Sequence, residues 1–240
     1  LISMFVRQEG MVGVQSTFTH VVQPLRAISP ADQEYEFDIP QTHGYVDLRN
    51  TRLYVKGYLA NRDGTRISKD DPVSVANNFL HSLWSSVSVF VGHSQLELYS
   101  GDHPYKSYIR QLMRFDEEAS DMVCELLTVD TMDAKTETDF ASAAGRNKYI
   151  AASKTLEMTG PTLLDFFQCD SYLLPSCPLR VRYRKNRDSF YCVSHDDVKD
   201  TELNFVIDNI ALLVPTVNIV PSLTPLLEMQ TDNSPANYAY

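Results

Sequence analysis

The sequence predicts an all-β fold, a β-sandwich of antiparallel sheets interrupted by a helical insertion. Short segments in which apolar and polar residues alternate recur along the chain, as half-buried strands require. In the middle third a helical spacing replaces the alternation. At 240 residues, 43% of them hydrophobic and 22% charged, the chain fits one large sandwich or two small domains with a substantial core.

The clearest strands lie in residues 77–99, which include Trp84, the only tryptophan. Gly92-His93-Ser94 reverses the chain, and apolar residues recur at every second position on both sides of it: Val87, Val89, Val91, Leu96 and Leu98. This pattern predicts a long β-hairpin. Its apolar side must be covered by a second layer from the rest of the chain.

Three segments precede the hairpin. Residues 1–30 show no sustained period, and we expect an N-terminal arm or a poorly structured lead-in there. Residues 33–40 predict a strand with an acidic outer face, since Tyr35, Phe37 and Ile39 alternate with Glu34, Glu36 and Asp38. Residues 53–59 predict another strand, and Asp63-Gly64 in the turn that follows suits a tight hairpin with a short return at 65–68.

The middle third predicts helices. The first would begin at Asp102 or Pro104 and carry apolar residues on one face: Tyr105, Tyr108, Ile109, Leu112 and Met113. A second run repeats the spacing at Ala119, Met122, Val123, Leu126 and Leu127. Between Gly101 and Phe140 there are ten acidic residues and four basic ones. We therefore expect an exposed, acidic helical insertion at about 102–145.

Alternation returns in the last third. It predicts strands at 149–158, 179–184, 189–193 and 203–214, with an apolar plug at 163–167. The last strand changes phase between Ile207 and Ile210, which predicts a β-bulge near Asp208-Asn209. Residues 31–220 would then form the domain, and 221–240 a C-terminal tail that reads as a loop.

Charge and cysteine usage exclude some classes of function. The formal net charge of −10 argues against a free-standing nucleic-acid binder. The four cysteines form no metal-binding spacing, and we expect them to be reduced and mostly buried. No apolar run approaches the ~18 residues of a membrane span, and residues 1–6 are too short for a signal sequence. A reducing intracellular compartment fits best, and the abrupt ends suggest a piece of a longer product.

Motifs for catalysis or cofactor binding are absent from the sequence. The six histidines are isolated, without an H-x-H or H-E-x-x-H pair, and no phosphate loop, dinucleotide fingerprint or nucleophile elbow occurs. His195-Asp196-Asp197 is the only local cluster of possible metal ligands, and a polar turn explains it better. We expect no enzyme, metal or cofactor, although a Cys/His pair could still meet in space.

Two groups of residues are candidates for a subunit interface. Arg180, Arg182 and Arg184 would form a row on one strand face, followed by Lys185 and Arg187. This row has three interpretations: a solvated face, a contact with the acidic insertion of a neighbouring copy that closes into a ring, or a nucleic-acid surface. Tyr105 and Tyr108 would be ordinary helix-face aromatics or part of such an interface.

A series of motifs in fixed order spans about Gln33 to Leu223: Leu83-Trp84-Ser85, Val87–Gly92, Tyr105–Ile109, Asp130–Asp133, Ser153-Lys154, Leu163–Phe167, Tyr172–Leu174, Leu179–Tyr183 and Asp188–Phe190. Each is weak alone, but their order is specific. It resembles the minor capsid, or penton, protein of Polinton/Maverick elements and the related adintoviruses, a family with counterparts in virophages.

The resemblance implies a single jelly-roll sandwich of about eight antiparallel strands in two sheets. It further implies a non-enzymatic subunit that assembles inside the host cell into homopentamers at the vertices of an icosahedral capsid. In the virion its main partner would be a double jelly-roll major capsid protein. The alternative is a jelly-roll binding module, such as a glycan-binding, receptor-binding or cytokine-like domain, or an element-derived host protein with another role.

Overall fold

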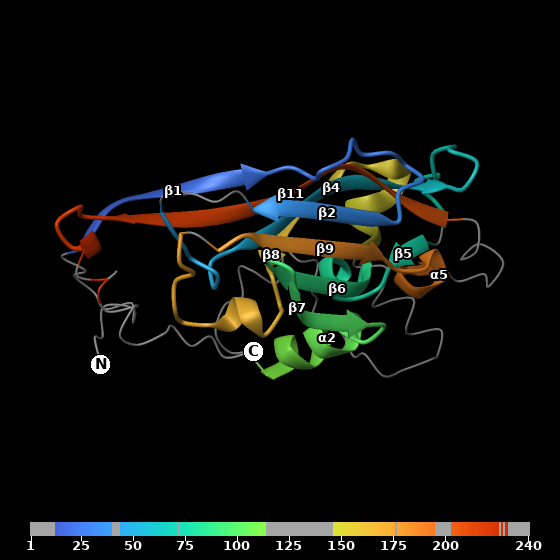
Figure 1. The fold of residues 1–240 in the computed structure, drawn as a ribbon. Coiled ribbons are helices and arrows are strands. Elements are labelled where there is room, and N and C mark those ends of the chain that lie inside the picture. The colour runs from blue at the N-terminus through green and yellow to red at the C-terminus, as the bar shows by residue number, and fades with distance from the viewer. Residues whose placement is uncertain are drawn as a thin grey trace.

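Two antiparallel sheets form the body of the molecule (Figure 1). The computed structural model describes residues 13–39, 44–71, 73–113, 146–175, 177–194, 203–225, 227 and 229. In the first sheet the strand order is β1 (Val14–Val22), β11 (Leu203–Ile219), β4 (Arg52–Asn61) and β8 (Leu156–Pro161), and the short β3 (Tyr45–Val46) also pairs with β11. In the second it is β2 (Glu34–Ile39), β9 (Leu179–Lys185), β6 (Trp84–Val91) and β7 (Ser94–Ser100).

Smaller elements close the ends of the sandwich. Strands β5 (Val73–Val75) and β10 (Cys192–Ser194) form a separate pair. The helices are α1 (Phe79–Ser82), α2 (His103–Met113) and α5 (Asp188–Tyr191), with single 3₁₀ turns at Ala151–Ser153 and Phe166–Gln168. Helix α2 follows β7 directly and lies beside the second sheet (Figure 1).

One hydrophobic core lies between the two sheets and confirms the predicted sandwich. Alternate residues of β2, β6 and β9 face alternate residues of β4 and β11, and all belong to one buried cluster. The predicted plug is part of it, since Leu164, Phe166 and Phe167 are fully buried. Full burial of such side chains contributes about 1.5–3 kcal/mol each, so this layer is the main source of stability.

The hairpin at 77–99 is confirmed as β6 and β7. Trp84 is 0% exposed, and its ring meets Tyr35 of β2 at 5.9 Å and Tyr183 of β9 at 5.2 Å, edge to face. Gly92 in the turn has φ +60°, a conformation that glycine adopts without strain. Trp84 therefore ties the hairpin to both of the other strands of its sheet.

The predicted bulge is confirmed on β11. The register against β4 shifts between Ile207 and Asn209, so Asp208 is the extra residue. The shift allows Ile207 and Ile210 to face the same core although they are three positions apart. Opposite the bulge, a Cβ on Gly57 would lie 2.2 Å from the Val206 carbonyl oxygen, so the strands approach closely there.

Two predicted strands are wrong in part. The segment 149–158 becomes a strand only at Leu156, because residues 146–150 are helical and Ala151–Ser153 form a 3₁₀ turn. The segment 189–193 begins in α5 and becomes a strand only at Cys192, which lets the Tyr191 ring turn into the core.

The lead-in predicted at 1–30 is wrong for β1, which pairs with β11 along its length. Its alternation is hard to detect in the sequence because β1 and the end of β11 extend past the second sheet (Figure 1), so inward positions such as Phe18 remain exposed. At the other end of the chain, residues 221–225 form a turn that enters a helical segment, where a loop was expected.

Three cysteines can be located. Cys169, Cys177 and Cys192 are free thiols, but only Cys192 of these is buried, so the expectation of mostly buried cysteines is wrong for this part of the chain. Burial raises the pKa of the Cys177 thiol. Among the described residues, no helix has the length and apolar character needed to cross a membrane.

Candidate functional site

The arginine row lies on the outer face of β9, as predicted. Leu179, Val181 and Tyr183 point into the core, and the intervening arginines point outward. Lys185, which the sequence placed beside the row, instead points inward: its Nζ donates to Asn204 Oδ1 at 2.7 Å and to the Phe205 carbonyl oxygen at 2.8 Å. Burial lowers the pKa of this lysine, and Asp188 partly opposes that effect.

Acidic partners for the arginines lie on the neighbouring strand of the same subunit. In the antiparallel register, β2 places Asp38 opposite Arg180, Glu36 opposite Arg182 and Glu34 opposite Arg184. The closest N···O distances in these three pairs are 2.8, 3.0 and 3.7 Å. We call these six residues the β2–β9 charge ladder.

The sequence contained the signal for this ladder. Residues 34–39 and 179–184 both alternate, with acids in one and arginines in the other, so an antiparallel pair of the two is the arrangement that neutralises both. The prediction considered acids only from a neighbouring copy. The Arg180 guanidinium illustrates the pairing, because its hydrogen bond to Asp38 raises its pKa.

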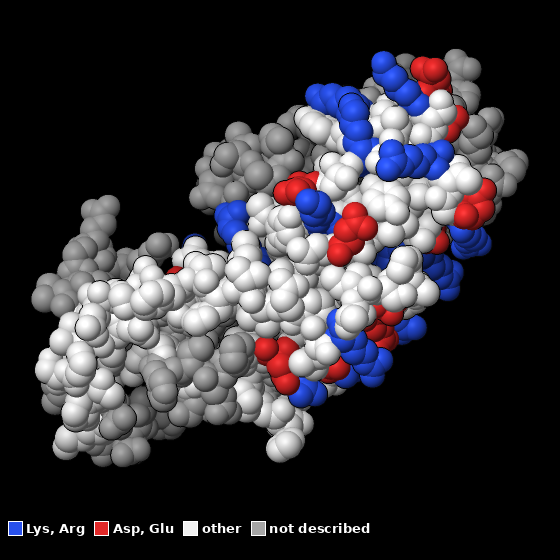
Figure 2. All heavy atoms as spheres, turned by 90° about the horizontal axis from the view of Figure 1, so that it is seen from above, with Lys and Arg blue, Asp and Glu red and all other residues white. Residues whose placement is uncertain are grey.

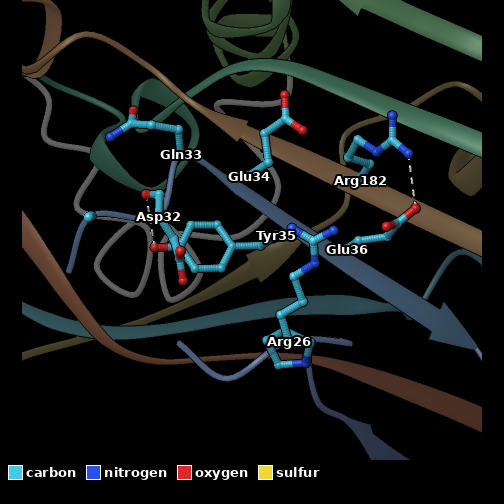
Figure 3. A pocket seen from close by; sticks show the side chains of 9 residues that line it. Arg26, Asp32, Gln33, Glu34, Tyr35, Glu36 and Arg182 are labelled. Carbon is cyan, nitrogen blue, oxygen red and sulfur yellow. Dashed lines mark hydrogen bonds and ion pairs between the residues drawn. The ribbon is translucent and has the colours of Figure 1, made fainter. Parts of the chain in front are cut away.

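A cavity of about 460 Å³ adjoins the ladder (Figure 3). Loop residues Pro24, Arg26, Ala31 and Asp32 form one wall, and the start of β2 with Arg182 forms the other. Burial raises the pKa of Tyr35 to about 12, with a smaller effect from Asp32. At neutral pH Tyr35 is thus a neutral phenol, and the wall groups can offer ion pairs and hydrogen bonds but no activated nucleophile.

Helix α2 is confirmed, and three of its apolar residues lie on its exposed side. His103 and Ser107 face the sandwich, and Lys106 and Arg110 are tied to Asp165. The apolar residues Tyr105, Ile109 and Met113 are 60%, 54% and 83% exposed. We call these three the α2 stripe. Tyr108 is half-buried, and the Tyr105 ring meets Phe190 of α5 at 5.8 Å.

The two predicted groups of interface residues are not brought together. The arginines lie on β9 within the ladder, whereas Tyr105 and Tyr108 lie on α2, which packs against α1 and β6. The second helix and most of the acidic insertion, residues 114–145, lie outside the described residues. The predicted contact between insertion and arginine row is therefore untested.

No protein-family model matches this sequence, and no curated protein matches it. Among solved structures, the Faustovirus major capsid protein has a TM-score of 0.51 at 9% identity, over 91% of this chain and 57% of that one. The mavirus major capsid protein has a TM-score of 0.48 at 13% identity, over 94% and 51%. The strand orders β1-β11-β4-β8 and β2-β9-β6-β7 are those of two facing antiparallel sheets, as in a jelly roll.

The fold is a jelly roll. The predicted fold class is thereby confirmed, with α2 in the connection between β7 and β8. The chain spans a little over half the length of the two capsid proteins. At this level of identity the likeness concerns the fold alone.

The described part of the jelly roll holds no cluster of three or more His, Cys, Asp or Glu that could bind a metal. His195-Asp196-Asp197 and His43 lie outside it. His81 and His103, which are isolated in the sequence, meet in the interior of the protein. The centres of their rings are 5.9 Å apart, and both residues are 2% exposed. Burial, with smaller effects of His81, Lys106 and Arg110, lowers the pKa of His103 to about 3. Their separation in sequence gave no signal of this contact.

Proposed function

We propose that this chain is a structural subunit of a virus capsid. The observation that carries the proposal is the eight-strand jelly roll, whose likeness to the Faustovirus major capsid protein extends over 91% of the chain. The motif order that resembles Polinton/Maverick minor capsid proteins supports it independently. A capsid subunit acts through its surfaces, and the two most distinctive surfaces here are a charge ladder and an apolar helix stripe.

Within the capsid, we assign the chain to the minor capsid, or penton, position of an adintovirus-like particle. It would form homopentamers at the vertices, contact a double jelly-roll major capsid protein, and be assembled inside the host cell. The motif order that resembles Polinton/Maverick minor capsid proteins is what supports this finer assignment. The proposed domain is residues 31–220 together with β1, which pairs with β11 of the first sheet, and a tail follows it.

The ring contact is proposed to use the α2 stripe and the charge ladder. Exposed Tyr105, Ile109 and Met113 offer an apolar strip at i, i+4 and i+8, and Tyr108 adds a partly polar aromatic beside it. Arg180, Arg182 and Arg184 offer charges that already have acidic partners. Charges of this kind make the association of subunits sensitive to salt and help to orient the subunits, but they contribute little to the affinity of the contact.

A matched pair of lysine substitutions tests the stripe. Ile109→Lys places a charge in the centre of the proposed contact, whereas Gln95→Lys adds the same charge to the exposed β7 strand. We expect Ile109→Lys to remain folded and to lose the ring in negative-stain images and in native mass, and Gln95→Lys to keep it. Equal assembly of both variants would exclude α2 from the contact. A wild-type trimer would instead favour the cytokine-like binding module.

A further inference from the structure

The outer edge of β1 carries unpaired main-chain groups. The Pro215 carbonyl oxygen accepts the Asp47 N–H on the side of β11 away from β1. Thr19 and Pro215 are therefore a non-hydrogen-bonded pair, and the N–H and C=O of Thr19 point away from β11. The two-residue period gives Thr17 and Val21 the same direction. These groups have no hydrogen-bond partner in the part of the chain that the structure describes.

Strand β1 itself carries no charged residue. The strands β2, β7 and β8, which form the other ends of the two large sheets, each carry at least one acidic residue, and such charges hinder pairing with another chain. No Asp, Glu, Lys or Arg occurs between Gly10 and Leu25, or in the Asn209–Leu227 segment that contains the paired end of β11. In Figure 2 the charged side chains of the described residues gather toward one end of this face.

Apolar side chains are exposed on and beside the same strand. Phe18 is 56%, Val21 59% and Leu25 52% exposed. Phe18 has the same strand parity as the buried Val22 but is itself exposed. An exposed phenylalanine on an uncharged strand edge is a contact surface of the kind that natural monomers avoid.

We propose that β1 pairs antiparallel with β1 of a second copy, around a two-fold axis at Phe18. In this register Thr17 of one copy lies opposite Thr19 of the other, and both residues direct their free N–H and C=O groups across the gap. Phe18 then faces its counterpart in a non-hydrogen-bonded pair, where side chains are closest. The sequence on both sides of Phe18 is thus self-complementary, as a two-fold contact requires.

Charge favours a second copy at this edge. Each chain carries a net −10, so two copies repel across most of their surfaces. Among the described residues, the uncharged segments 13–24 and 209–225, in and beside β1 and β11, are where the approach of two copies costs least. The contact uses none of the residues of the proposed ring, so it goes beyond that function and stands or falls separately. One added strand pair is smaller than a standard interface of ~1,600 Å², so the association is weak and depends on concentration.

Substitutions at Thr19 test the main-chain pairing. Thr19→Pro removes the outward N–H but leaves the bonds to β11, since proline is tolerated at edge positions whose N–H faces solvent. Thr19→Val keeps the donor and serves as the control. In sedimentation velocity at increasing concentration, wild type and Thr19→Val should form species of at least twice the basal mass, and Thr19→Pro should associate about tenfold more weakly or worse.

Cysteine cross-linking tests the register and does not depend on the proline variant. Across a non-hydrogen-bonded pair the Cα atoms are about 4.5 Å apart, within the disulfide range of ~4.4–6.8 Å. Phe18→Cys should therefore form a disulfide-linked dimer on mild oxidation. Thr17→Cys should not, because its counterpart lies diagonally across the strands, and wild type gives the background of the native cysteines.

Three results would overturn the proposal. The first is a wild-type chain that stays at its basal mass at every concentration. The second is a Thr19→Pro variant that associates as strongly as wild type. The third is a Thr17→Cys variant that forms the disulfide-linked dimer as readily as Phe18→Cys. A ring that forms without any of this pairing would leave the proposed capsid function intact. Pairing without a ring would support the edge contact alone.

Discussion

Lys185 directly follows the exposed arginines of β9, yet its ammonium group lies inside the sandwich. It is 6% exposed, and besides its two hydrogen bonds it lies 3.8 Å from Asp188. The strand alternation explains the position, because Lys185 has the same parity as the core residue Tyr183. A buried cation with this many partners is costly to remove, since each partner then loses its hydrogen bond.

Lys185→Met should destabilise the fold by about 1–3 kcal/mol, because Asn204 and the Phe205 carbonyl would each lose a donor. Arg184→Met, the neighbouring substitution on the exposed face, should cost less than about 0.5 kcal/mol, since exposed ion pairs contribute little. Urea unfolding of both variants measures the difference. Equal losses would mean that Lys185 contributes only as a surface charge.

His103 should make the stability depend on pH. In the folded protein its pKa is about 3, against 6.5 ordinarily. Between these values the unfolded chain binds the extra proton, so stability is complete above pH 6.5 and falls as the pH drops, by about 1.4 kcal/mol per unit. From pH 7 to pH 5 the loss should be about 2 kcal/mol.

His103→Phe keeps a ring beside His81 but cannot take up a proton. Its unfolding free energy should change less between pH 7 and pH 5 than that of wild type, as urea titrations at the two pH values would show. If the two proteins lose the same stability over this range, His103 is not the group responsible.

At the scale of elements, the β2–β9 charge ladder changes what a charge reversal does. We consider the triple variant in which Arg180, Arg182 and Arg184 are all changed to Glu. Together with the three acids of β2 it would have six carboxylates on two adjacent strands, and like charges opposite each other destabilise a sheet. We expect a lower unfolding midpoint for the triple variant. Adding Glu34→Arg, Glu36→Arg and Asp38→Arg should restore it.

The protein with all six charges of the ladder exchanged also distinguishes an effect on folding from an effect on ring assembly. If the swapped protein folds like wild type but forms no ring, the sign of the outer charges matters to a neighbouring subunit. If it folds and assembles normally, the ladder acts within the subunit only. A triple variant as stable as wild type would contradict the pairing itself.

Elements that carry their own pattern could be predicted from the sequence. The spacing of Val87 and Val89 on β6 was enough to predict that both side chains are buried. The change of phase around Asp208 was likewise enough to predict the bulge on β11. Elements defined by distant partners could not. Strand β1 depends on β11 about two hundred residues later, and the orientation of α2 depends on the contacts of Asp165 with Lys106 and Arg110.

The candidate site shows the same limit. Exposure of the arginine row followed from alternation along β9, but its neutralisation by β2 required knowledge of which strands are adjacent. Helical spacing grouped Tyr105 with Ile109 and Met113 correctly. It left open whether these aromatic residues are ordinary helix-face residues or part of an interface, because hydrophobicity alone does not distinguish a buried face from one that contacts a partner subunit.

For the whole molecule, we propose that this jelly roll is a capsid subunit that assembles into rings of five. The single chain has a mass of 27.2 kDa. A ring needs a contact that repeats head to tail and closes, and the α2 stripe and the charge ladder are different surfaces, as such a contact requires. Its charged part should be weaker at high salt.

The most direct test is the native mass of the purified chain by light scattering at low and high salt, with negative-stain images of the same samples. We expect a mass five times that of the chain and five-fold rings, with fewer rings as salt rises. A monodisperse trimer, or a monomer at every salt and protein concentration, would contradict it.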